Sequence, residues 1–221
     1  MNGILIGDIE VALIWVSVVA FVIFAVFFFN KYRTTDVESQ SWFYFGLALF
    51  CICFATARIM FMCSDFVKGG IWAGSVLDQY FYWRLAAIFG IGSVLFVLFV
   101  IERYMVKTRY IITIGTSIGL VIALIFPVIP IGQMATYIFT PIGVLGIVGL
   151  YGYLIKNSSG KIRLKTFLTL IGIFVIFLGF VIDTDFGQDL LPFAPEIIGI
   201  TASIVMTVGG LVFVLGYRME V

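Results

Sequence analysis

Seven stretches of apolar, almost uncharged sequence follow one another along the chain, separated by short polar segments. They cover residues 11–29, 42–63, 79–101, 111–126, 133–155, 166–182 and 197–217. Apolar stretches of about 20 residues are long enough for a helix that crosses the hydrocarbon core of a bilayer. The pattern predicts an all-α fold: one domain over residues 1–221, built as a polytopic seven-transmembrane helix bundle. Pro141 falls within the fifth stretch, so that helix either kinks there or begins near it.

Composition supports the same class of protein. Hydrophobic residues make up 62% of the 221 residues and charged residues 11%, and the mean hydropathy is +1.19. A water-soluble globular domain has about 25% charged residues, so this class is excluded. Seven helices leave no room for a kinase, cyclase or nucleotide-binding domain. The chain has no histidine, and we expect no metal, no cofactor and no nucleic-acid partner.

The basic residues predict an orientation. Ten of the thirteen Lys and Arg follow the first, third, fifth and seventh stretches: Lys31, Arg33, Arg103, Lys107, Arg109, Lys156, Lys161, Arg163, Lys165 and Arg218. Cytoplasmic connections of membrane proteins carry an excess of Lys and Arg. We therefore expect a multi-pass protein of the plasma membrane, with the N-terminus outside and the C-terminus in the cytoplasm. Acidic residues gather on the predicted outer side: Asp8, Glu10, Asp65, Asp78, Asp183, Asp185, Asp189 and Glu196.

Two arginines fall inside predicted spans. Arg58 precedes the outer end of the second span by five residues, and Arg84 follows the outer start of the third. A charge at the centre of a span costs about 2.5–3.5 kcal/mol on insertion scales, so such residues are candidates for function. Their depths match, which favours an outward-facing pocket for a small anionic ligand or lipid head group. The predicted lining is Arg58, Arg84, Tyr80, Tyr82, Trp83, Asp183 and Glu196. The alternative is a salt-bridge network that only clamps the helices together.

The other end of the third span carries Glu102, Arg103 and Tyr104. These residues are either an anchor among anionic lipids or a cytoplasmic switch that a partner protein breaks. Seven helices with Glu-Arg-Tyr closing the third resemble the layout of rhodopsin-like G-protein-coupled receptors. That resemblance implies an ionic-lock role for Arg103. The residues 197–217 contain no lysine, so the chain does not have the Schiff-base lysine of retinal proteins.

Three readings of the function follow. The chain resembles the seven-helix sensory modules of prokaryotes, which implies a receptor-like or sensory protein that signals through a separate cytoplasmic partner. It is also similar to the SWEET sugar carriers in helix number, orientation and length, which implies a small transporter. A structural or lipid-organising subunit in contact with membrane lipid is the third. We expect no enzyme activity and no catalytic residues, because the predicted spans offer only scattered Ser and Thr hydroxyls without a histidine base.

Overall fold

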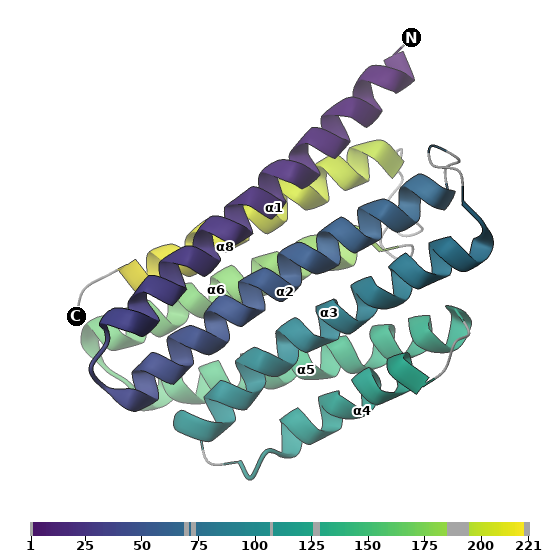
Figure 1. Cartoon of the computed structure of the whole chain (residues 1–221). Coiled ribbons are helices and arrows are strands. Elements are labelled where there is room, and N and C mark those ends of the chain that lie inside the picture. The colour runs from purple at the N-terminus through teal and green to yellow at the C-terminus, as the bar shows by residue number, and fades with distance from the viewer. Residues whose placement is uncertain are drawn as a thin grey trace. The chain divides into compact units, whose positions relative to one another are not determined.

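The computed structural model describes residues 2–68, 71, 74–106, 108–125, 129–184 and 195–218 (Figure 1). These residues form α1 (Asn2–Thr34), α2 (Glu38–Lys68), α3 (Val76–Tyr104), α4 (Ile111–Ile125), α5 (Ile129–Asn157), α6 (Gly160–Ile182) and α8 (Pro195–Arg218). No strand occurs among them. For the described residues, the predicted all-α fold is confirmed.

Six of these helices are long and apolar enough to cross a membrane, namely α1, α2, α3, α5, α6 and α8. The exception is α4, whose 15 residues span about 22 Å, against a hydrocarbon core of about 30 Å. Each of the seven predicted apolar ranges coincides with one helix, apart from residue 126, which lies outside the described residues. The helices support a multi-pass membrane protein, while α4 as a seventh crossing stays a prediction.

Pro141 lies inside α5, which starts at Ile129 and continues to Asn157. The helix therefore does not begin near Pro141, which was one of the two alternatives that the sequence left open. A proline has no N–H to donate to the carbonyl four residues earlier, so α5 runs through this position with one backbone hydrogen bond fewer.

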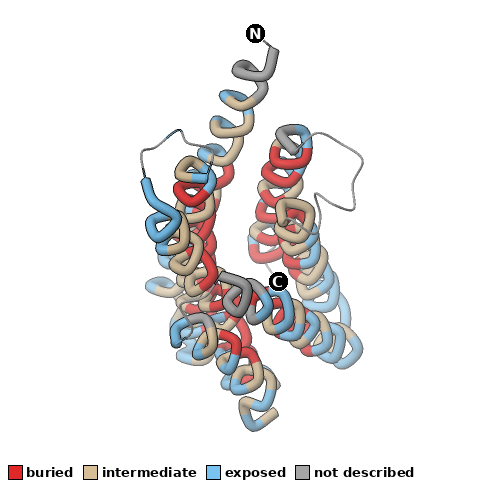
Figure 2. The backbone as a smooth tube through the Cα atoms, turned by 90° about the vertical axis from the view of Figure 1, so that its right-hand side faces the viewer, coloured by how far each residue is buried: buried red, intermediate tan, exposed pale blue. Residues whose placement is uncertain are grey.

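Contacts between residues group the chain into two compact units. We call Val22–Ile147 the central unit, and Met1–Phe21 together with Val148–Val221 the terminal unit. Along the helices, buried positions recur at intervals between exposed ones (Figure 2). This periodicity is what helices packed on one side and facing lipid on the other require.

In the central unit, α2 and α3 lie antiparallel side by side (Figure 1). Gly46 of α2 lies so close to α3 that an added Cβ would overlap the Val100 side chain. Helix α5 approaches its neighbours in the same way, since a Cβ on Gly143 would lie 2.7 Å from the Val94 Cγ1 atom of α3 and 3.0 Å from the Thr116 Cγ2 atom of α4. In lipid, burial of apolar side chains does not drive helices together, so helices associate through close packing at small residues.

In the terminal unit, α6 and α8 form a still closer antiparallel pair. A Cβ added to Gly172 would lie 2.5 Å from the backbone nitrogen of Phe213, and one added to Gly209 would lie 2.6 Å from that of Ile176. These contacts are with backbone atoms, which cannot move aside as a side chain can. The two glycines therefore set the distance between α6 and α8.

A hydrogen bond between two tyrosines joins α5 to α8 in the same unit. The hydroxyl oxygens of Tyr151 and Tyr217 are 2.9 Å apart, and both residues are buried. Tyr217→Phe removes the partner of the Tyr151 hydroxyl, so we expect a loss of about 1–3 kcal/mol in the free energy of unfolding. Replacing both tyrosines by Phe is expected to recover most of this loss. A double-mutant cycle by thermal unfolding in detergent checks it, and additive losses would contradict a shared hydrogen bond.

Candidate functional site

The start of α3 is fixed by a capping box. The Ser75 hydroxyl accepts a hydrogen bond from the Asp78 backbone N–H at 3.3 Å, and the Asp78 carboxylate accepts one from the Ser75 N–H at 2.7 Å. The same carboxylate accepts the Ser75 hydroxyl at 2.8 Å. Reciprocal bonds of this kind satisfy the first free N–H groups of a helix. Asp78 therefore has a structural role at the helix start.

Contacts between α2 and α3 place the two predicted arginines. Phe61 packs edge-on against Trp83, with ring centroids 6.5 Å apart, and the Ser64 hydroxyl donates to the Gln79 carbonyl at 3.3 Å. With the helices antiparallel, this register puts Arg58 within about one turn of Arg84 along the axes. The two arginines therefore lie on neighbouring helices at similar heights.

Arg58 is the more enclosed of the two, with 3% of its surface exposed, whereas Arg84 is half-buried. Each takes part in at least one interaction with another group. Burial without partners is costly for a guanidinium, so these interactions are part of what keeps Arg58 inside the bundle. An interior arginine with a second arginine nearby is an arrangement that can grip a carboxylate or phosphate through several N–H groups.

The aromatic residues predicted beside the arginines also lie on the first turns of α3. Tyr80, Tyr82 and Trp83 are half-buried, and Tyr82 packs edge-on against Phe81 with centroids 5.7 Å apart. Rings at this position suit either a ligand site or the aromatic belt at a membrane surface.

The two predicted carboxylates belong to the terminal unit, and the arginines to the central unit. Asp183 is half-buried and is the C-cap that follows α6, where its N–H donates to the Gly179 carbonyl at 3.2 Å. Glu196 is the second residue of α8, but its side chain lies outside the described part of the structure, as do Asp185 and Asp189. A pocket that joins these acids to Arg58 and Arg84 stays a prediction.

Glu102, at the other end of α3, has a precise role that the sequence did not reveal. Its side chain is 3% exposed and accepts hydrogen bonds from the backbone N–H groups of Ile112 at 3.3 Å and Thr113 at 2.9 Å. The hydroxyls of Thr108 and Thr113 donate to the same carboxylate. The remaining N–H groups of the first turn of α4, those of residues 111 and 114, donate to the carbonyls of residues 108 and 110. Glu102 thus caps α4, and all four N–H groups of that turn are satisfied.

Arg103 and Tyr104 are not among the described hydrogen-bond donors to the Glu102 carboxylate. Arg103 is exposed and donates from its Nη1 atom to the Tyr110 hydroxyl at 2.9 Å. The Tyr110 ring also stacks on Phe99, with centroids 5.6 Å apart, and Tyr104 is exposed. Among the described contacts, Glu102 and Arg103 therefore bind different partners, although they are adjacent in sequence.

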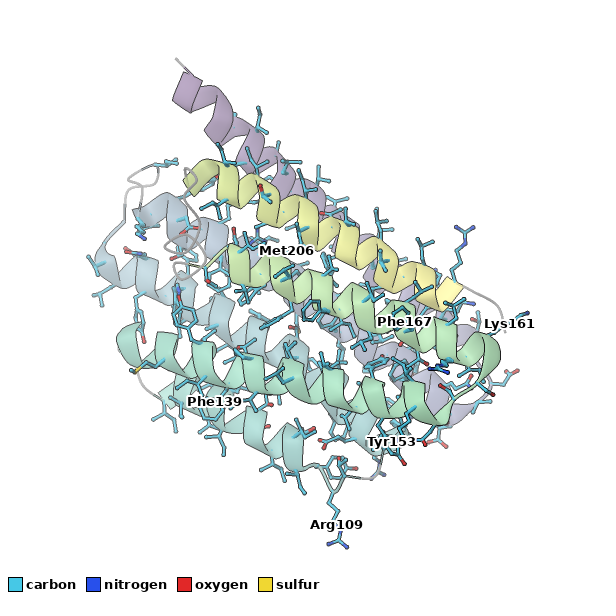
Figure 3. All side chains as sticks on the ribbon, turned by 180° about the vertical axis from the view of Figure 1, so that it is seen from behind. Arg109, Phe139, Tyr153, Lys161, Phe167 and Met206 are labelled. Atoms are coloured by element: carbon cyan, nitrogen blue, oxygen red, sulfur yellow. The ribbon has the colours of Figure 1, made fainter. Side chains whose placement is uncertain are left out.

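Backbone geometry in this connection is strained. Arg109 and Tyr110 have φ of 57° and 61°, which is the left-handed region that residues with a Cβ adopt at a cost of about 1–2 kcal/mol each. The Arg109 side chain extends away from the helices (Figure 3). The contacts of Tyr110 with Arg103 and Phe99, together with the Glu102 cap, hold the connection in this conformation.

Two sets of contacts among the described residues were not predicted from the sequence. Thr108 and Thr113 were not predicted as hydrogen-bond partners of Glu102. The sequence offers one signal for these contacts, because the short connection after α3 brings the two threonines back to the Glu at the end of that helix. Glu10 makes the other set: α1 begins at Asn2, so Glu10 lies within the helix, and its carboxylate lies against Gly199 of α8. Gly199 leaves room there for the acid, which has at least one interacting group.

No metal centre is formed by the described residues, since no three of their His, Cys, Asp or Glu side chains lie close enough to share an ion. Comparison of the chain with protein-family models, with curated proteins and with solved structures found no match.

Proposed function

We propose that the chain is a receptor-like sensory protein of the plasma membrane. Arg58 and Arg84 form the cationic part of an outward-facing polar site for a small anionic ligand or a lipid head group. Tyr80, Tyr82, Trp83, Asp183 and Glu196 complete the site in this proposal. The N-terminus lies outside, and a separate cytoplasmic protein receives the signal.

The burial of Arg58 is the observation that carries the proposal. An arginine inside a membrane-length helix lowers the stability of the fold and is retained where it has a task. The α2–α3 register adds Arg84 at a similar height, so two guanidinium groups present up to ten N–H donors to one anion. A transporter would concentrate its polar groups near the middle of the membrane, between repeats.

Neutral substitution of the arginines tests the site. With phosphate, acetate and succinate as probes, we expect at least one to raise the melting temperature of the purified protein. Arg58→Gln and Arg84→Gln are each expected to lower the affinity for that probe by about 10- to 100-fold, which is what the loss of a charge-assisted hydrogen-bond pair costs. Arg103→Gln makes the same charge change at the opposite end of α3 and is the control.

Two results would point to other functions, and a third would exclude the site. If no probe stabilises the protein and Arg84→Gln and Arg84→Leu both unfold it, the arginines are a structural clamp. Sugar uptake into proteoliposomes would favour the SWEET-like transporter. Unchanged probe binding in folded Arg58→Gln and Arg84→Gln variants would exclude the site.

A charge exchange tests whether Asp183 belongs to the site. Arg84→Asp alone is expected to abolish probe stabilisation, and the pair Arg84→Asp with Asp183→Arg is expected to restore part of it if the two side chains meet. No recovery, in protein that is still folded, would remove Asp183 from the site.

A further inference from the structure

Five basic residues gather at one end of the terminal unit, where α5 ends, α6 begins and α8 ends. They are Lys156, Lys161, Arg163, Lys165 and Arg218. Only Ser158 and Ser159 separate α5 from α6. The antiparallel packing brings in α8, because a Cβ on Gly216 would lie 3.2 Å from the Lys165 carbonyl oxygen.

This end lacks compensating acids. The sequence from Arg103 to Ile182 contains no Asp or Glu, and neither does the sequence from Ile197 to Arg218. Glu220 follows in the sequence, outside the described residues, and would still leave four positive charges unbalanced. The α1–α2 connection differs, because Asp36 and Glu38 balance Lys31 and Arg33 there.

The cations are accessible, and one of them is held in place. Lys156, Lys161, Arg163 and Arg218 are exposed, and Lys161 extends away from the helices at this end (Figure 3). The Lys165 Nζ atom lies 5.4 Å from the centre of the Tyr217 ring, and the hydroxyl of that tyrosine is bonded to Tyr151. A cation over an aromatic ring is attracted to it, so Lys165 has a preferred position.

Exposed apolar side chains adjoin the charges. Tyr153 of α5 is 57% exposed, and Ile162 and Phe167 of α6 are 52% and 47% exposed. Tyr153 and Phe167 lie on the helices a short way from Lys161 (Figure 3). Cations at the end of membrane-length helices, with apolar and aromatic groups next to them, match the boundary between lipid head groups and acyl chains.

We propose that this basic end of the terminal unit is a binding surface for anionic phospholipid. Lys156, Lys161, Arg163 and Arg218 contact the phosphate and head group, and Tyr153, Ile162 and Phe167 contact the acyl chains. The charge selects an anionic partner, and the exposed apolar groups select one that carries acyl chains. The surface lies outside the set of residues in the proposed arginine site and does not depend on it.

Phosphatidylglycerol is the probe, with phosphatidylcholine as the neutral lipid and inorganic phosphate as the soluble anion. The purified full chain is titrated with each in detergent, and the melting temperature and the lipid retained in native mass spectrometry are measured. Each Lys or Arg near a charged lipid surface contributes about fivefold in affinity. Lys161→Gln with Arg163→Gln is therefore expected to weaken phosphatidylglycerol binding by roughly 25-fold.

Lys31→Gln with Arg33→Gln is the matched control, because it removes the same two residue types at the same spacing from the connection where acids balance them. We expect this control to change the affinity by less than threefold, and Lys161→Arg with Arg163→Lys to keep it. Raising the salt concentration is expected to weaken binding to the wild-type protein.

Three outcomes would overturn the proposal. One is that phosphatidylcholine binds as tightly as phosphatidylglycerol. Another is an equal loss of phosphatidylglycerol affinity in the Lys161→Gln, Arg163→Gln variant and in the Lys31→Gln, Arg33→Gln control. This result would show that the lipid is attracted to any cation of the chain. The third is that inorganic phosphate stabilises the protein as strongly as the lipid and competes with it, which would show a site for a soluble anion.

Discussion

Gly172→Ala is expected to destabilise the protein by about 1–3 kcal/mol, although alanine is the better helix former. The added methyl group would lie 2.5 Å from the Phe213 nitrogen and 2.6 Å from its Cα atom. Ordinary contact between such atoms requires about 3.5 Å or more. Relief therefore requires α6 and α8 to move apart along their interface, which loses dispersion contacts at neighbouring positions. Gly209→Ala makes a similar clash and is expected to have a similar effect.

The same substitution elsewhere in the terminal unit provides the control. Gly149 and Gly152 of α5 have open space where a Cβ would be added, so alanine there is expected to be neutral or to stabilise by up to about 1 kcal/mol. Melting temperatures of the four variants in one detergent make the comparison. A gain or no change for Gly172→Ala would show that α6 and α8 are not packed backbone to backbone.

The glycines show which packing contacts cannot be predicted from the sequence alone. The stripe Gly143, Gly146, Gly149 and Gly152 has a helical spacing, but only the first two contact neighbouring helices closely, at Val94 and Ile112 respectively. Periodicity identifies a face of a helix and does not identify what faces it. Gly172 lies seven residues before Gly179, which also packs against α8, but this spacing alone does not reveal which helix faces the two glycines.

Helix positions were predicted more successfully than helix lengths. Each apolar range marks the part of a helix that avoids charge, whereas backbone hydrogen bonding continues into polar residues. For this reason α1 extends from Asn2 to Thr34, although its apolar range covers only residues 11–29. The start of α3 was also placed too late, at residue 79, although Ser75 and Asp78 have the spacing of a capping box.

At the C-terminal end of α3, the sequence identified Glu102, Arg103 and Tyr104 as a lipid anchor or a cytoplasmic switch, and it did not identify the separate partners of Glu102 and Arg103. Adjacent residues on a helix point about 100° apart, so their partners come from different neighbouring segments. The partner of Glu102 is the start of α4, and that of Arg103 is Tyr110. Such contacts depend on how the connection folds back, which no local pattern encodes. The ionic-lock role of Arg103 implied by the receptor resemblance stays a prediction.

Glu102→Ala is expected to cost about 3 kcal/mol and to unwind the first turn of α4. The substitution removes the acceptor of the N–H groups of Ile112 and Thr113 and of the hydroxyls of Thr108 and Thr113. Each buried donor that loses its partner costs about 1–3 kcal/mol, and loss of a helix cap costs about 1 kcal/mol. Glu102→Gln keeps one acceptor oxygen, so we expect an intermediate loss.

Hydrogen exchange distinguishes a cap from a general loss of stability. Exchange of the amides at residues 112 and 113 is expected to accelerate in Glu102→Gln under conditions where the α6–α8 pair stays protected. Arg103→Gln is the control, because it removes the neighbouring charge and its hydrogen bond to Tyr110 but leaves the Glu102 acceptors of α4 in place. If a Glu102–Arg103 ion pair held this end instead, both variants would expose α4 equally. Protection retained in Arg103→Gln and lost in Glu102→Gln would show that the carboxylate acts through α4, so that any partner protein that displaces Glu102 also releases the start of that helix.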